Sequence, residues 1–265
     1  MRRIDRRIVM ALAMTALAAG CGSEGGEEPD AGSPADADAD EGLAAPPDGE
    51  GLQLRLTSTL APSEEKWICQ YVPLPDRSID VARFEHGYAL SGHHLLLYPT
   101  RLDAADVDLD PFECPGGATP EEGITGFTYV AQLPSGEVAY PPGVAWHYEA
   151  SEVVLLEAHV VNATDAAIPV DHRMNLWFAD QPADQYAGTL FLFDTGIYVP
   201  AHGTYTARMD CAVPADITVT ALQSHMHLRG EAYRSWLTGG PLEEPQPLLT
   251  IDRDWAPSEP VELSP

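Results

Sequence analysis

The most regular feature of the sequence is a series of short apolar runs that proline and glycine interrupt at short intervals. No apolar pattern with a helical period continues for three turns, so the sequence does not predict long helices. Short runs between turn residues are typical of an all-β sandwich, and the chain has room for one large or two small β domains. We expect strands at residues 88–98, 126–133, 153–161, 175–178, 188–193, 204–209 and 217–228.

The first twenty residues have the pattern of a bacterial lipoprotein signal peptide. Four arginines precede an apolar segment, residues 8–19, that is too short to span a bilayer. The segment ends in LAAGC at residues 17–21, which is similar to a lipobox. A short buried helix with a chance cysteine is the alternative. We expect cleavage before Cys21, lipidation of its thiol and a membrane anchor. An acidic residue directly after the lipidated cysteine would indicate retention in the inner membrane. The residue at this position is Gly22, so the outer membrane is favoured.

An acidic segment follows the signal. Residues 22–50 contain ten acidic residues and no Lys or Arg, together with many Gly, Ala and Pro. Such a composition cannot bury enough apolar surface to offset chain entropy, so we predict a disordered tether over residues 21–51. The whole chain carries a formal net charge of -27, and removal of residues 1–20 leaves 10 basic against 40 acidic side chains. This balance argues against nucleic acid or anionic lipid as a partner.

Three cysteines remain after lipidation: Cys69, Cys114 and Cys211. Thiols in exported proteins tend to pair, and three thiols cannot all pair within one chain. Cys69 and Cys114 bracket two adjacent histidines and would close one loop around them. We therefore expect a Cys69–Cys114 disulfide, with Cys211 left over.

The adjacent histidines, His93 and His94, precede an apolar run. Neighbouring strand residues point to opposite faces, so the two imidazoles converge only if the strand bends or ends there. Gly92, directly before them, supplies the freedom for a bend. Farther along, the even positions of residues 153–161 are apolar and predict a core face, which leaves His159 on the opposite face of that strand.

A second histidine motif, His225-Met-His227, lies near the end of the chain. Residues two apart in a strand project from the same face, so both imidazoles can reach one metal ion, while Met226 points the other way. Imidazole ligands without thiolate suit Zn, Cu, Fe or Ni, so the residue types alone do not choose the metal.

Six motifs follow one another between about residues 53 and 261. They are WICQYVPLP at 67–75, GHHLLLY at 92–98, CPGG at 114–117, YPPGV at 140–144, LEAHVVN at 156–162 and HMHLRG at 225–230. In this order they resemble the copper type II, ascorbate-dependent monooxygenases, which include peptidylglycine alpha-hydroxylating monooxygenase and dopamine beta-monooxygenase.

The resemblance implies two consecutive antiparallel jelly-roll-like β-sandwiches, residues 52–173 and 174–265, with one copper each. His93, His94 and His159 match the site that stores and passes an electron. His225 and His227 match two ligands of the second copper, where oxygen binds and where catalysis takes place. The implied activity is hydroxylation of an activated C–H bond of a small organic substrate by O2, with ascorbate as the reductant. The Cys69–Cys114 disulfide also fits the family.

Three features depart from the family pattern. The family's second copper takes a methionine ligand from a segment well after the His-x-His strand, and the sequence reaches Pro265 before such a segment. The sequence also reaches Pro265 before a cysteine that could pair with Cys211. We therefore expect the second sandwich to be incomplete. Peptide-amidating members carry an arginine at the position of Gln223, so a glycine-extended peptide is not the expected substrate. The alternative function is an extracytoplasmic copper-binding or electron-transfer lipoprotein of the same fold.

Other polar and sulfur side chains are expected to have supporting roles. Glu157 shares a strand face with His159 and could orient that ligand, with a salt bridge or simple exposure as the alternative. Met174 and Met209 lie in apolar contexts that favour packing over metal binding. Four histidines beside turn residues are expected to be solvated or hydrogen-bonded surface groups: His86, His147, His172 and His202.

Overall fold

The computed structural model describes residues 42–89, 91–115, 123–194, 196–213, 216–226, 229–239 and 242–252, with the backbone of strand residues 7–14 and 261–262. These residues form strands and one short 3-10 helix, η1 (Ala104–Asp106), so the all-β prediction is confirmed. In this part of the chain no helix combines the length and apolar character needed to cross a membrane. The predicted lipidation site Cys21, most of the tether and His227 lie outside the described residues.

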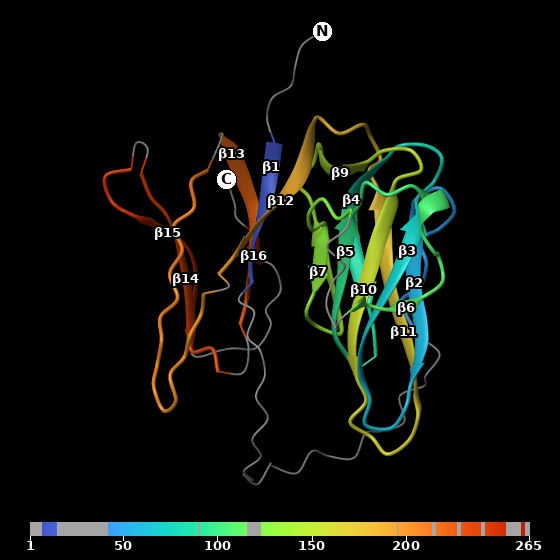
Figure 1. Cartoon of the computed structure of the whole chain (residues 1–265). Helices are drawn as coiled ribbons and strands as arrows, with labels where there is room; N and C mark the ends of the chain where they lie inside the picture. The colour runs from blue at the N-terminus through green and yellow to red at the C-terminus, as the bar shows by residue number, and fades with distance from the viewer. Residues whose placement is uncertain are drawn as a thin grey trace.

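The larger of the two main sheets has nine strands (Figure 1). Its order is β16 (Val261–Glu262), β13 (Ile217–His225), β1 (Arg7–Met14), β12 (Gln185–Phe193), β9 (Val144–Tyr148), β4 (Ile79–Gly87), β11 (Ile168–Phe178) and β2 (Gly51–Leu60), with β8 (Ser135–Ala139) paired to β4.

The second main sheet has five strands, and a separate hairpin has two. The five-stranded order is β6 (Phe112–Glu113), β3 (Glu65–Pro73), β10 (Val153–Val161), β5 (Gly92–Pro99) and β7 (Tyr129–Ala131); the hairpin is β14 (Ala232–Leu237) and β15 (Gln246–Asp252).

The core lies between the five-stranded sheet and the β2, β4 and β11 part of the nine-stranded sheet, which face each other in Figure 1. Leu56 and Phe84 from one layer and Leu97 and Leu156 from the other belong to a single buried cluster. The central strand β10 is buried along all of its length except Val161, because β3 and β5 flank it and both of its faces are covered. A strand in this position is the most rigid platform that the sheet offers for a side chain.

Most of the predicted strands are present. Residues 153–161 coincide with β10, and residues 217–228 and 188–193 correspond to β13 and β12 with shifted ends. The strand predicted at residues 204–209 is wrong, because that segment has no regular secondary structure. Tyr205 and Met209 are 49% and 41% exposed, so the apolar residues of this segment are not buried against a neighbouring strand. The expected packing of Met209 is therefore also wrong.

The two halves of the chain share a sheet. β12 pairs in parallel with β9. β1, which lies within the predicted signal peptide, pairs in parallel with both β12 and β13, so a chain cleaved before Cys21 would lack this link between β12 and β13. The sequence-derived boundary between residues 173 and 174 lies inside β11, and the division into two domains stays a prediction. Large apolar side chains are more exposed in the second half, with Tyr198 72% and Trp236 52% exposed.

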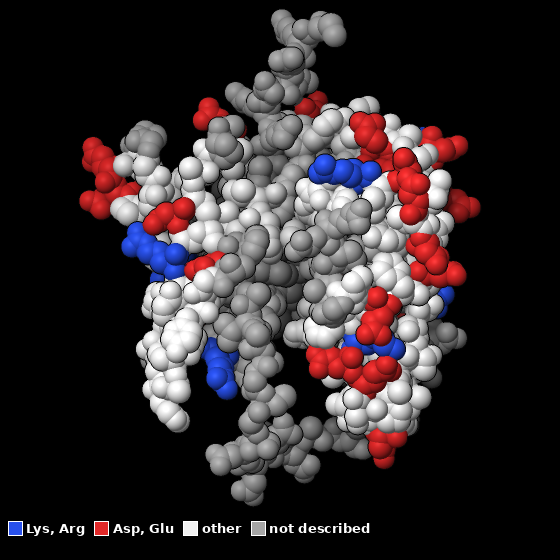
Figure 2. Space-filling view, in the orientation of Figure 1, with Lys and Arg blue, Asp and Glu red and all other residues white. Residues whose placement is uncertain are grey.

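The surface reflects the acidic composition. Figure 2 shows Asp and Glu side chains spread over the visible face with few Lys or Arg side chains between them. Of the basic groups that are described, Arg55 and Arg83 form ion pairs with acidic neighbours, Asp171 and Glu137. The folded chain therefore presents no broad basic surface on this face, in line with its net charge.

Candidate metal centre

His94 and His159 meet across two paired strands. They are direct partners in the antiparallel pairing of β5 with β10. The next pair along is Gly92 with Val160, so His93 is an extra residue on β5 at a bulge. A bulge re-aims a side chain that would otherwise point to the opposite face of the sheet. The strand irregularity that the sequence predicts at Gly92 is present, and it lets neighbouring imidazoles turn toward the same point.

The three histidines form a compact cluster. Their ring centroids are separated by 5.2 Å for His93 and His94, and by 5.1 Å from each of these to His159. One nitrogen from each ring lies within 4.8 Å of the others. Two nitrogens bound to one metal at about 2.0 Å lie at most about 4 Å apart, so small rotations of the side chains bring all three into ligand positions. The cluster thus has the number and type of ligands for a transition metal.

The cluster is covered on one side and open on the other. His159 is 8% exposed, and the indole of Trp67 stacks on its ring with 3.8 Å between the centroids and 10° between the planes. His94 is half-buried, whereas His93 is exposed to solvent. A small reductant or a metal ion can approach this centre from the His93 side, while Trp67 holds the His159 ring in one orientation.

A carboxylate determines which nitrogen of His159 carries its proton. Glu65 Oε1 lies 2.8 Å from His159 Nε2. A carboxylate only accepts hydrogen bonds, so Nε2 is the donor and the lone pair of the neutral ring is on Nδ1. Carboxylate partners of this kind orient metal-binding histidines and raise their basicity. Glu65 is adjacent in sequence to Lys66 and near Trp67, but no sequence pattern pairs it with His159.

Glu157, the acid that the sequence suggests for this role, is buried beside the disulfide. It is 2% exposed, so the alternative of simple exposure is wrong. The Tyr98 hydroxyl donates to Glu157 Oε2 at 3.4 Å, and Glu157 is the cross-strand partner of Cys69. Glu157 therefore lies beside the disulfide, two residues along β10 from His159.

Gly92 is required by close packing beneath the cluster. A Cβ atom at this position would lie 2.4 Å from Tyr88 Cδ2 and 2.5 Å from His172 Nε2. These distances are far below van der Waals contact, so any larger residue would displace the two rings or the bulge. The rings of Tyr88 and His172 stack with 4.9 Å between their centroids. This buried pair supports the backbone that carries His93.

Two of the four histidines expected at the surface are buried instead. His172 is 0% exposed and His86 is 3% exposed, because both lie on central strands of the larger sheet, β11 and β4. His86 bonds Tyr129 Oη and the Leu133 carbonyl at 2.7 and 2.8 Å. Neither ring nitrogen of His172 has a hydrogen-bond partner among the described residues. The expectation holds for His147, which bonds Asp80 at 2.6 Å, and for exposed His202.

Burial of His172 predicts a pH-dependent stability. Desolvation lowers the pKa of His172 to about 4, although the Asp171 carboxylate opposes this shift. The unfolded chain, with an ordinary histidine pKa, binds a proton between about pH 6.5 and 4, whereas the folded chain does not. The free energy of unfolding of the metal-free protein should therefore fall by roughly 3 kcal/mol between pH 7 and pH 4 on account of this residue.

Denaturant unfolding of the wild type and of His172→Leu at pH 7 and at pH 4.5 measures this effect. The variant should lose clearly less stability on acidification, because leucine cannot take up a proton. Burial also lowers the pKa of His86. This residue is present in both proteins, so its effect on stability is the same in the wild type and in the variant. Equal losses in the two proteins would show that His172 is not the responsible group.

The second histidine motif is described only in part. His225 ends β13, and its Nδ1 contacts the Oε1 atom of Gln132. His227 lies outside the described residues, so its predicted role as a ligand stays a prediction. Gln223, two residues before His225, is 3% exposed. Met174 is fully buried in the core, as expected for a packing residue.

The predicted disulfide is confirmed. Cys69 on β3 is bonded to Cys114, and the two residues are 45 positions apart in sequence. Both are buried, and the Cys114 amide also donates to the Trp67 carbonyl at 2.9 Å. The disulfide therefore ties the segment after β6 to the strand that carries the indole stacked on His159. Cys211 is exposed and has a free thiol.

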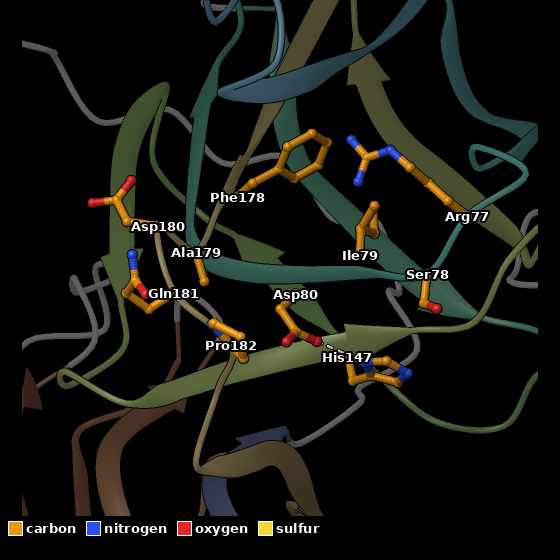
Figure 3. A pocket seen from close by; sticks show the side chains of 10 residues that line it. All are labelled: Arg77, Ser78, Ile79, Asp80, His147, Phe178, Ala179, Asp180, Gln181 and Pro182. Carbon is orange, nitrogen blue, oxygen red and sulfur yellow. Dashed lines mark hydrogen bonds and ion pairs between the residues drawn. The ribbon is translucent and has the colours of Figure 1, made fainter.

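Figure 3 shows a surface cavity beside β4, and its volume is about 380 Å³. Figure 3 shows the Arg77 guanidinium near the Phe178 ring and Asp80 paired with His147. The Arg77 Cζ atom lies 4.9 Å from the centroid of the Phe178 ring. The cavity is lined by Arg77, Ser78, Ile79, Asp80, His147, Phe178, Ala179, Asp180, Gln181 and Pro182. None of the four described histidines of the motifs lines it: His93, His94, His159 and His225.

Comparisons with known proteins do not assign the chain. No protein-family model matches it, and no curated protein matches it.

Proposed function

We propose that this protein is a copper-dependent monooxygenase-like lipoprotein that hydroxylates an activated C–H bond of a small organic substrate with O2 and an ascorbate-type reductant. The observation that carries the proposal is the cluster of His93, His94 and His159 on paired strands. The ordered motifs at 67–75, 92–98, 114–117, 140–144, 156–162 and 225–230 support copper as the metal.

The residues of the cluster suit copper. Three imidazoles provide borderline-soft nitrogen ligands that accept both common oxidation states of copper, and the exposed side at His93 admits a reductant. When bound, copper supplies one-electron redox chemistry and the activation of O2. The chain itself supplies the orientation: Trp67 and Glu65 hold the His159 ring, and the bulge at His93 directs the third imidazole. A rigid set of ligands limits the rearrangement that accompanies a change of oxidation state.

The catalytic role belongs to the second site in this proposal. His225 and His227 would hold the copper at which O2 reacts, and the substrate would bind near them. The His93, His94 and His159 site would pass electrons to it. Lipid on Cys21 and the acidic residues 21–51 would tether the folded part to the outer membrane.

A copper-binding or electron-transfer lipoprotein of the same fold is the second candidate. The observation that favours it is the arrangement of the first site, where one ligand is covered by Trp67 and another is exposed. Such a site can exchange electrons or metal with a partner without any second copper. Both functions need the same three histidines.

Copper stoichiometry and oxygen consumption separate the two functions. We expect the purified chain from residue 21 onward to bind about two coppers as a monooxygenase and about one as a carrier, according to the ligand sets. The monooxygenase should also consume O2 with ascorbate only when a C–H substrate is present. One tightly bound copper without substrate-dependent O2 consumption would favour the carrier, and absence of tight copper binding would contradict both functions.

A further inference from the structure

Gln132 contacts His225 from the end of β7, the strand next to β5. It follows β7 directly and is 7% exposed. β7 pairs in antiparallel fashion with β5, and the last pair is Ala131 with Leu95. The next residue beyond this pair is Gln132 on the β7 side and His94 on the β5 side. The Gln132 side chain reaches β13, where Nε2 donates to the Ser224 carbonyl at 3.3 Å and Oε1 contacts His225 Nδ1. One residue thus joins the strand of the first site to the strand of the second.

The contact with Ser224 determines the orientation of the Gln132 amide. The Ser224 carbonyl only accepts hydrogen bonds, so the amide NH2 must face it and the amide oxygen must face His225. The opposite orientation would place two oxygens against each other. Because the amide oxygen also only accepts, His225 Nδ1 must carry a proton. The lone pair of the neutral His225 ring is then on Nε2.

We propose that Gln132 is a positioning residue of the second copper site, which holds His225 as the Nδ1–H tautomer with Nε2 as the metal-binding atom. The inference rests on the proposed function, and it adds a residue that none of the ordered motifs contains. Gln132 acts through His225 rather than on the metal. Its position at the end of β7 also links the second site mechanically to the strand that carries His94. Loss of such a partner typically weakens metal binding about 10- to 100-fold.

The test compares Gln132→Leu with the wild type and with Gln70→Leu. Leucine keeps the approximate size and removes both hydrogen bonds. Gln70 is a matched control, since its amide on β3 donates to the Leu109 carbonyl in an exposed hydrogen bond. Long-range 1H–15N NMR of the metal-free proteins reports the His225 tautomer, and copper titration followed by electron paramagnetic resonance reports the affinity of each site. Circular dichroism checks the fold.

We expect Gln132→Leu to lose the Nδ1–H preference of His225 and to weaken copper binding at the second site about 10- to 100-fold, with the first site unchanged. If the leucine variant does not fold, Gln132→Asn replaces it, because the shorter amide cannot reach both the Ser224 carbonyl and His225, and it should show the same losses. Gln70→Leu should behave as the wild type.

Three results would overturn the inference. The first is an unchanged tautomer and affinity in Gln132→Leu, and the second is equal weakening of both sites. The third is a wild type that binds copper at the three-histidine site but not at His225, which leaves the electron-transfer function standing. A wild type that binds copper at neither site contradicts the proposed function itself, so the two failures are distinguishable.

Discussion

Replacing His94 with alanine should abolish tight copper binding at the three-histidine site while the sandwich remains folded. His94 is the cross-strand partner of His159 and is half-buried, so its ring can be removed without opening the core. The loss removes one of three ligands directly. The affinity for copper should therefore fall by more than the roughly 100-fold that loss of a supporting residue costs. Competition titration with a copper chelator measures the affinity, and circular dichroism measures the fold.

His202→Asn is the matched control for this experiment. His202 is exposed and has a positive φ of 57°, a conformation that asparagine tolerates. This variant removes one imidazole from the chain without touching the cluster, and it should keep full copper affinity. Collapse of the circular dichroism spectrum in His94→Ala would instead identify His94 as a core residue. Unchanged affinity would show that the cluster does not bind copper through this ring.

The second large effect concerns the disulfide. Replacing both Cys69 and Cys114 with serine should lower the free energy of unfolding by about 4 kcal/mol, because the bond closes a long loop in the unfolded chain. The loop spans 45 positions and contains His93 and His94. Denaturant unfolding under non-reducing conditions measures the loss. Since both sulfurs are buried next to Glu157, the loss of packing adds to the loss of the crosslink.

Cys211→Ser is the control for the disulfide variant. Its thiol is free and exposed, so its replacement should change the stability by less than about 0.5 kcal/mol. Copper binding adds a second readout, because Cys69 lies on β3 two residues from Trp67, which stacks on His159. The double serine variant should therefore also bind copper more weakly. Equal stability of the double variant and the wild type would contradict the structural role given to this bond.

The local sequence pattern was sufficient to predict the features of the site that depend on a single strand and the direction of its side chains. The alternation of residues 153–161 predicts β10, and the cysteine positions predict the disulfide that the structure contains. The need for a bend at Gly92 follows from two adjacent histidines, and the structure contains a bulge there. Each of these inferences uses neighbours in the chain or a simple loop, which is the information that a single sequence carries.

The local sequence pattern did not predict the contacts between a side chain and a partner on a strand that is distant in sequence. Glu65 contacts His159 because β3 and β10 pair in a register that local alternation does not contain. His172 lies near turn residues in the sequence, yet it is fully buried because β11 is flanked by β2 and β4. Residues 204–209 have a strand-like composition, but no neighbouring strand pairs with them among the described residues.

The sequence by itself determined the all-β class, the candidate ligands and the cysteine pair, since strand periodicity and local motifs act over a few residues. Only the tertiary structure decided that the imidazole of His159 lies within reach of the same atom as those of His93 and His94. It also decided that Glu65 and Gln132 hold His159 and His225. The physical reason is that cross-strand register and the packing of one sheet on another are set by the whole chain, so the partner of a side chain is a property of the assembled sheets.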